Sequence, residues 1–199
     1  NGVIDINKIE NADIENPKAQ DEDEPTSYIK DGAMGYNISG YDAKSFATNA
    51  KTKFKCVKKT YIPKASRIAV LFDYTKSMIY DKDAEQLVDV EDYIYTIGDD
   101  WVKDFPKEIK QAEDAFIEEF NDEIERKLFL TRDLDKANYV MVFSPIQFCY
   151  GRRIGGLKKD NKGWITAVVW LFQKNVKNEP IGVFEAIRLS ASPTSWAKV

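Results

Sequence analysis

Apolar positions in the second half of the chain fall into continuous runs, which predict four strands. A short run with few polar positions is typical of a strand that is covered on both faces. The runs are Ile68–Phe72, Tyr139–Phe143 with Ile146–Tyr150 extending it past Pro145, Trp164–Phe172 and Ile181–Leu189. The polar turn 173–179 separates the last two runs, so we expect these to form an antiparallel hairpin.

A helix is predicted between Asp104 and about Lys127. Apolar residues recur there at helical spacing, and we expect this stripe to pack on the core. The stripe consists of Ile109, Ala112, Phe116, Phe120 and Ile124. Asp104 is suited to the N-cap and Pro106 to the first turn, so we expect the helix to begin there.

The remaining segments have less regular patterns. Residues 28–64 are ambiguous. Asp42 is suited to capping a short helix through about Lys51, and residues 54–62 alternate loosely, with Phe54, Cys56 and also Val57 expected to point inward. Residues 75–104 form an acidic connection that is too long for an ordinary loop, so we expect short elements of its own or a lid.

This order of elements predicts an α+β fold, with a mixed or antiparallel sheet of about four to six strands and one main amphipathic helix packed on one face. We assign residues 1–27 to an acidic extended arm and residues 28–199 to a single α+β domain, which is clearest over 63–190. The arm is rich in Asn, Asp and Glu and lacks a sustained apolar period.

Charge is distributed unevenly around a net charge of −4. The segment from Ala43 to Lys64 has seven lysines and no acid, whereas residues 1–24 have two lysines and eight acids, namely Asp5, Glu10, Asp13, Glu15, Asp21, Glu22, Asp23 and Glu24. One interpretation is solvated faces and an acidic leader. The other is an acidic arm that docks on a basic face, in the same molecule or on a partner.

The chain contains no histidine. This excludes Ser-His-Asp and Cys-His catalysis, imidazole acid–base chemistry and His-ligated metal sites. Cys56 and Cys149 have neither CxxC nor zinc spacing, and the pattern leaves open whether they pair. We predict no catalytic residue, no metal and no cofactor. We also predict no transmembrane segment, because no run approaches the roughly 20 apolar residues that span a bilayer.

A basic, glycine-rich loop over residues 151–163 is the candidate binding site. Its candidate ligand-binding residues are Arg152, Arg153, Lys158, Lys159 and Lys162. Glycine-flanked backbone amides and arginine side chains favour an anion, so the loop suggests nucleic acid or acidic lipid as ligand. The alternative interpretation is a solvated hairpin tip.

Two carboxylates give a further alternative, a carboxylate-based hydrolase. Asp73 ends the first predicted strand, and Glu185 lies among apolar neighbours on the last one. Such a pair would have to approach closely to hydrolyse a glycoside. We also expect several aromatic side chains to be exposed for recognition or for covering the sheet: Tyr28, Tyr36, Tyr41, Tyr80, Tyr93, Tyr95 and Trp101.

Two segments carry a family resemblance. Pro63–Phe72 resembles the opening strand of the TolB amino-terminal domain and of CsgG-like bacterial envelope lipoproteins, and Lys136–Val142 resembles a later strand of these small α/β domains. The resemblance covers roughly 63–190, and the long insert 75–104 departs from it. It implies a non-enzymatic interaction or scaffold domain, exported to the bacterial envelope or periplasm, with a protein partner there. Polyanion binding and the hydrolase remain alternatives.

Overall fold

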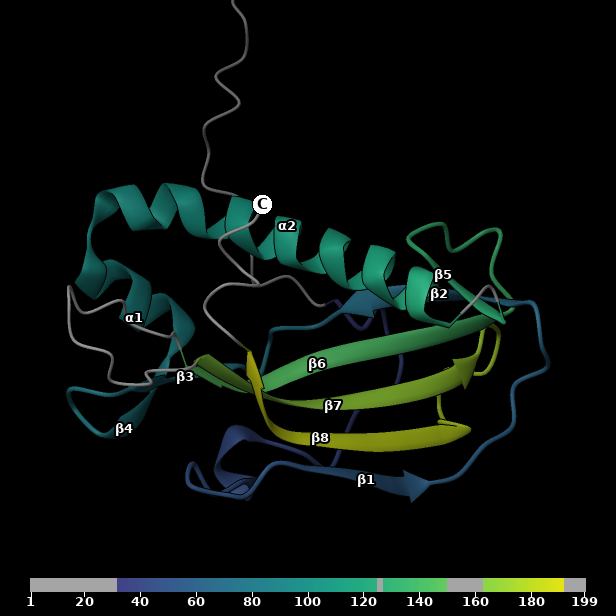
Figure 1. Ribbon diagram of the computed structural model, residues 1–199, viewed down its shortest axis with the longest axis horizontal. Coiled ribbons are helices and arrows are strands. Elements are labelled where there is room, and N and C mark those ends of the chain that lie inside the picture. The colour runs from purple at the N-terminus through teal and green to yellow at the C-terminus, as the bar shows by residue number, and fades with distance from the viewer. Residues whose placement is uncertain (1–31, 125–126, 150–162, 192–199) are drawn as a thin grey trace, which may run out of the picture.

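Eight strands form one mixed sheet in the computed structural model, which describes residues 32–124, 127–149 and 163–191 and omits the side chains of residues 99–101 and 191. The strands are β1 (Lys53–Lys58), β2 (Ser66–Phe72), β3 (Met78–Asp81), β4 (Gln86–Asp89), β5 (Leu128–Thr131), β6 (Tyr139–Cys149), β7 (Gly163–Gln173) and β8 (Gly182–Ala191). Their order across the sheet is β1-β8-β7-β6-β2-β5, so β1 is one edge, at the bottom of Figure 1.

The pairing of the strands divides the sheet into two parts. β6, β7, β8 and β1 are successively antiparallel, whereas β2 runs parallel to both β5 and β6. β3 joins the carboxyl half of β6 in parallel and carries β4 as an antiparallel partner. The register aligns one residue from each of five strands in what we call the transverse row: Phe72, Phe143, Val169, Phe184 and Cys56.

Two helices and a 3-10 turn complete the described part. The turn η1 is Ala43–Ser45, α1 is Val90–Ile97, and α2 is Asp99–Glu123. α2 crosses the β2 and β5 side of the sheet (Figure 1), where the Phe116 ring lies 5.0 Å from the ring of Phe143 and 6.0 Å from that of Phe72. The amphipathic stripe of α2 therefore covers the sheet face to which Phe72 belongs.

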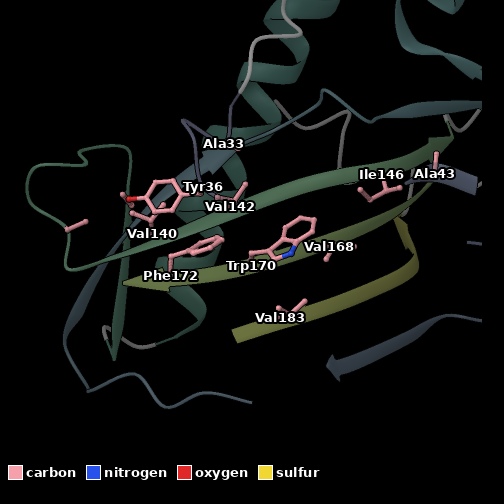
Figure 2. Close-up of a cluster of buried hydrophobic side chains, with 12 residues drawn as sticks. Ala33, Tyr36, Ala43, Val140, Val142, Ile146, Val168, Trp170, Phe172 and Val183 are labelled. Carbon is pink, nitrogen blue, oxygen red and sulfur yellow. The ribbon is translucent and has the colours of Figure 1, made fainter. Parts of the chain in front are cut away.

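The opposite face of the sheet is covered by the segment that precedes β1. Tyr36 from this segment lies beside Phe172 of β7 and Ala43 beside Ile146 of β6, in one buried cluster that also includes Trp170 and Val168 (Figure 2). Because successive residues of a strand point to opposite faces, the largely apolar β7 supplies both layers of the core. A third cluster forms where α1 and the start of α2 pack on β3.

A buried glutamine fixes the covering segment to the sheet. Gln147 of β6 is fully buried, and its Nε2 donates to the carbonyl oxygens of Ala43 at 2.6 Å and of Phe46 at 2.8 Å. Both carbonyls belong to the η1 turn region, whose start is capped by the Asp42 side chain accepting from the Ser45 amide. A polar side chain inside an apolar layer therefore anchors the turn by satisfying its backbone.

The predicted fold class is wrong. The described sheet has eight strands rather than four to six, and α1 adds a second helix. The missing strands are short or exposed: β3, β4 and β5 have four residues each, and β1 has no buried position. Such strands lack the continuous apolar run by which β2, β6, β7 and β8 were predicted, and those four are confirmed.

The start of the long helix also differs from the prediction. α2 begins at Asp99, so Asp104 is not its N-cap and Pro106 lies inside the helix. Pro106 removes only one backbone donor there, and Phe105 beside it is buried in the third cluster, so tertiary packing outweighs the local cost. The insert 75–104 contains β3, β4 and α1, as expected for a connection of that length.

Candidate functional site

The edge strand β1 is unusual because every one of its six residues is exposed. One side of the strand pairs with β8, and the other side pairs with no strand in the described part of the chain. A strand in this position presents a row of backbone N–H and C=O groups to solvent. β1 is therefore a surface with free hydrogen-bonding groups along its length.

Lysine side chains surround this edge. Lys55 and Lys58 each have an acidic partner, since Lys55 Nζ lies 3.2 Å from Glu185 Oε1 and Lys58 Nζ lies 2.9 Å from Glu179 Oε1. Lys51, Lys53 and Lys59 are exposed and form no ion pair with any residue that the structure describes. These three lysines leave the edge with uncompensated positive charge.

Large apolar side chains are exposed on the same edge. Phe54 is 72% exposed, Val57 46% and Tyr61 82%. Isolated exposed apolar residues are common on protein surfaces, but three within eight positions of an unpaired edge form a local group. We call the group Lys51, Lys53, Phe54, Val57, Lys59 and Tyr61, together with the free backbone of β1, the basic edge.

An ion pair between an exposed lysine and a buried carboxylate holds the basic edge in register with the sheet. Glu185 of β8 is 6% exposed, accepts from Tyr41 Oη at 3.0 Å and pairs with Lys55 directly across the strand boundary. Burial first, and then the hydrogen bond and charge of Glu185, raise the pKa of Tyr41 to about 12. Thr52 Oγ1 also donates to the Arg188 carbonyl at 2.8 Å, just before the strand begins.

A β-bulge shapes the middle of the edge. The pairing with β8 shifts between Cys56 and Lys58, so Val57 is the extra residue. A bulge increases the local twist of an edge strand and limits continuous pairing with a flat partner sheet. The basic edge is therefore suited to a short extended segment rather than to a long second sheet.

The residues predicted as the binding site lie outside the described part of the chain. Arg152, Arg153, Lys158, Lys159 and Lys162 all belong to 150–162, so the anion-binding interpretation of that loop stays a prediction. The acidic arm 1–27 lies outside it as well.

The carboxylates of the alternative hydrolase are not brought together. Asp73 follows β2 and Glu185 lies on β8, with β6 and β7 between them. Three strand spacings correspond to about 14 Å, well beyond the separation of a glycosidase pair. Asp73 is also occupied locally, because its Oδ1 accepts from the Thr75 amide at 2.8 Å and the Thr75 hydroxyl at 2.6 Å.

The two cysteines have contrasting surroundings. Cys56 is exposed on β1, Cys149 is buried at the end of β6, and both are thiols rather than a disulfide. Burial raises the pKa of the Cys149 thiol. Across residues 32–124, 127–149 and 163–191, no three Cys, Asp or Glu side chains are grouped closely enough to hold a metal ion.

Sequence reasoning found the charge of the basic edge but not its geometry. The run of lysines from Ala43 to Lys64 marked a basic face. Phe54, Cys56 and Val57 are predicted from the sequence to point inward, and this prediction is wrong because all three are exposed on β1 among the described residues. Tyr36, predicted to be exposed, is buried beside Phe172 at a ring distance of 5.0 Å.

Comparisons with known proteins give no family. No family model matches the chain, and no curated protein matches it. Among solved structures, a PelC variant dodecamer from Paraburkholderia phytofirmans matches with a TM-score of 0.40 and 9% identity, covering 73% of this chain and 88% of that chain. A second PelC dodecamer from the same organism matches with a TM-score of 0.38 and 9% identity, covering 71% and 82%.

These likenesses are too weak to support an argument about fold or function. One structural finding bears on the membrane: within the described residues, no helix combines the length and the apolar character needed to cross a bilayer. The chain is thus similar to PelC at a low TM-score and is assigned here to no family.

Proposed function

We propose that the chain is a non-enzymatic interaction domain that binds an acidic, extended polypeptide segment along its basic edge. The observation that carries this proposal is the complete exposure of β1 on an edge of the sheet, beside three lysines; within the described residues neither the edge has a strand partner nor the lysines an acidic one. Strand addition to a sheet edge is a common mode of peptide recognition, in which main-chain hydrogen bonds supply affinity and side chains supply specificity.

The charge of the edge favours an acidic occupant over a second copy of β1. Two β1 edges placed side by side would bring the unpaired charges of Lys51, Lys53 and Lys59 near their equivalents. Like charges that face each other across strands are destabilising, and lysines on edges protect natural sheets from self-pairing. An acidic segment would instead satisfy both the backbone and the lysines.

The shape of the site favours a polypeptide over a nucleic acid or a lipid surface. Phosphates and headgroups engage lysine side chains, but they cannot continue a backbone hydrogen-bond ladder along β1. An extended peptide can do so while Phe54 and Tyr61, both largely exposed, pack on its side chains. An extended acidic peptide would thus use both the free backbone of β1 and the exposed apolar side chains beside it.

A binding measurement with a defined probe tests the proposal. A fluorophore on the exposed thiol of Cys56 reports binding of poly-L-glutamate to the full chain, with poly-L-lysine as the negative probe. We expect affinity for polyglutamate that weakens as salt rises, because the contacts are exposed. The triple variant Lys51→Glu, Lys53→Glu and Lys59→Glu should reduce this affinity at least about tenfold, corresponding to about 1.4 kcal/mol.

A matched variant controls for net charge. Lys76→Glu, Lys103→Glu and Lys110→Glu alter three exposed lysines on the turn before β3 and on α2, and should leave binding within about twofold. Equal loss in both triple variants would refute the site. Tighter binding of single-stranded DNA or of anionic vesicles than of polyglutamate would refute the polypeptide class.

The predicted location is part of the same proposal. The resemblance to envelope lipoprotein domains implies an exported protein, and an edge that captures an acidic segment fits a scaffold there. Fractionation of the native host tests this, since recovery with the cytosolic proteins would contradict the envelope location.

A further inference from the structure

We infer that the acidic stretch 1–24 of this same chain occupies the basic edge and competes with outside ligands, an inference that rests on the function proposed above. The basic edge has three lysines that form no ion pair with a described residue, and the stretch has eight acids against two lysines. Electrostatic complementarity of this kind guides association and selects partners. The chain thus contains an acidic segment that matches its own docking surface.

The connection between the two is long enough. A Cβ on Gly32 would lie 1.6 Å from the Phe72 carbonyl oxygen, so the described chain begins against the carboxyl end of β2. Phe72 belongs to the transverse row, which ends at Cys56 in the middle of β1. Four strand spacings separate them, about 19 Å. Eight residues from Glu24 to Gly32 can span about 26 Å.

The position of Gly32 along the strand direction also affects how far the connection has to reach. Gly32 lies against Phe72, and Phe72 and Cys56 belong to the same transverse row. The connection therefore has to cross the strands but does not have to extend along them. Residues further upstream than Glu24 have more reach still. Asp5, Glu10, Asp13 and Glu15 can therefore reach any part of the basic edge.

Tethering makes even a weak contact effective. A segment joined to its site by a short linker acts at an effective concentration of about 1 mM. If the free segment bound with a dissociation constant of about 0.1 mM, tethering would occupy the edge in about nine molecules of ten and raise the apparent dissociation constant of a competitor about tenfold. The arm would then set a threshold that an outside partner has to exceed.

Paramagnetic relaxation measures the contact directly. A nitroxide on Cys56 of the full, nitrogen-15-labelled chain should broaden the amide signals of residues 1–24. The broadening should disappear in Lys51→Glu, Lys53→Glu and Lys59→Glu and persist in the matched variant of Lys76, Lys103 and Lys110. A sample that mixes nitroxide-labelled, unenriched chain with enriched, unlabelled chain should show no broadening.

The outcomes separate this inference from the proposed function. Neutralising the arm with Asp21→Asn, Glu22→Gln, Asp23→Asn and Glu24→Gln, together with the four upstream acids, should tighten polyglutamate binding about tenfold. If residues 1–24 are not broadened and neutralisation changes nothing, the inference is overturned, while retained polyglutamate binding still supports the proposed function. Broadening in the mixed sample would overturn docking within one molecule. Absent polyglutamate binding in the neutralised chain would overturn both.

Discussion

Replacing Gln147 by leucine should destabilise the protein by removing the anchor between the sheet and the η1 turn. Gln147 is fully buried, and its Nε2 is hydrogen-bonded to the carbonyl oxygens of Ala43 and Phe46. Leucine keeps most of the volume but donates to neither carbonyl. The variant therefore isolates the polar contribution of the side chain from its packing.

The size of the effect follows from the groups that lose partners. Losing this donor costs the two carbonyls together about 2–3 kcal/mol, because the contact with Phe46 is only partly buried and the Ala43 carbonyl keeps a longer bond from the Phe46 amide at 3.5 Å. Gln147 Oε1 has no partner among the described residues, so removing it returns about 1 kcal/mol. The net loss is about 1–2 kcal/mol, equivalent to a Tm lower by about 2–8 °C.

Urea unfolding followed by circular dichroism measures this loss as a lower midpoint at unchanged slope. Gln173→Leu is the matched control, because Gln173 is exposed at the end of β7 and should change the free energy of unfolding by less than about 0.5 kcal/mol. A Gln147→Leu variant within that same limit would refute the reasoning that the two carbonyls depend on this amide.

Three further predictions follow from single groups. Cys56 should react with a thiol reagent in the native state and Cys149 only on unfolding, which timed alkylation with mass spectrometry checks; equal rates would contradict the burial of Cys149. Because the pKa of Tyr41 is raised to about 12 in the folded chain, its contribution to stability is present below about pH 10 and lost toward pH 12. Stability curves of wild type and Tyr41→Phe should therefore converge over that range, and parallel curves would refute the assignment. Gly32→Ala places a Cβ 1.6 Å from the Phe72 carbonyl oxygen and should lower the Tm, whereas an unchanged Tm would contradict this close approach.

The central strands and the long helix could be predicted because burial of apolar side chains dominates the choice of residues in each of them. β2 and β7 are continuous apolar runs buried on both faces, and Phe116 and Phe120 of α2 repeat at helical spacing against that sheet. Burial of apolar surface produces these patterns, and each pattern can be recognised within a short stretch of sequence. The spacing of apolar residues within each segment is therefore sufficient to predict these elements.

The edge strand could not be predicted in this way, because its position depends on contacts distant in sequence. Lys55 pairs with Glu185, and Tyr41 binds the same carboxylate, across more than a hundred residues. Nothing in the order Lys-Phe-Lys-Cys-Val-Lys shows that both faces of the strand are exposed, and its loose alternation predicts a buried Phe54, which the structure contradicts. The lysine run indicated the charge of the site, while only the sheet order shows it to be an unpaired edge.

Amide hydrogen exchange of β1 tests the central claim most directly. Addition of poly-L-glutamate to the full chain whose eight acids in residues 1–24 have been neutralised should slow exchange across Lys53–Lys58 at least about tenfold, because a strand added to the open edge protects its outward N–H groups. Exchange in β5, the opposite edge, should be unchanged. Unchanged exchange in β1 at a polyglutamate concentration that saturates binding would contradict the claim that the basic edge is the docking surface.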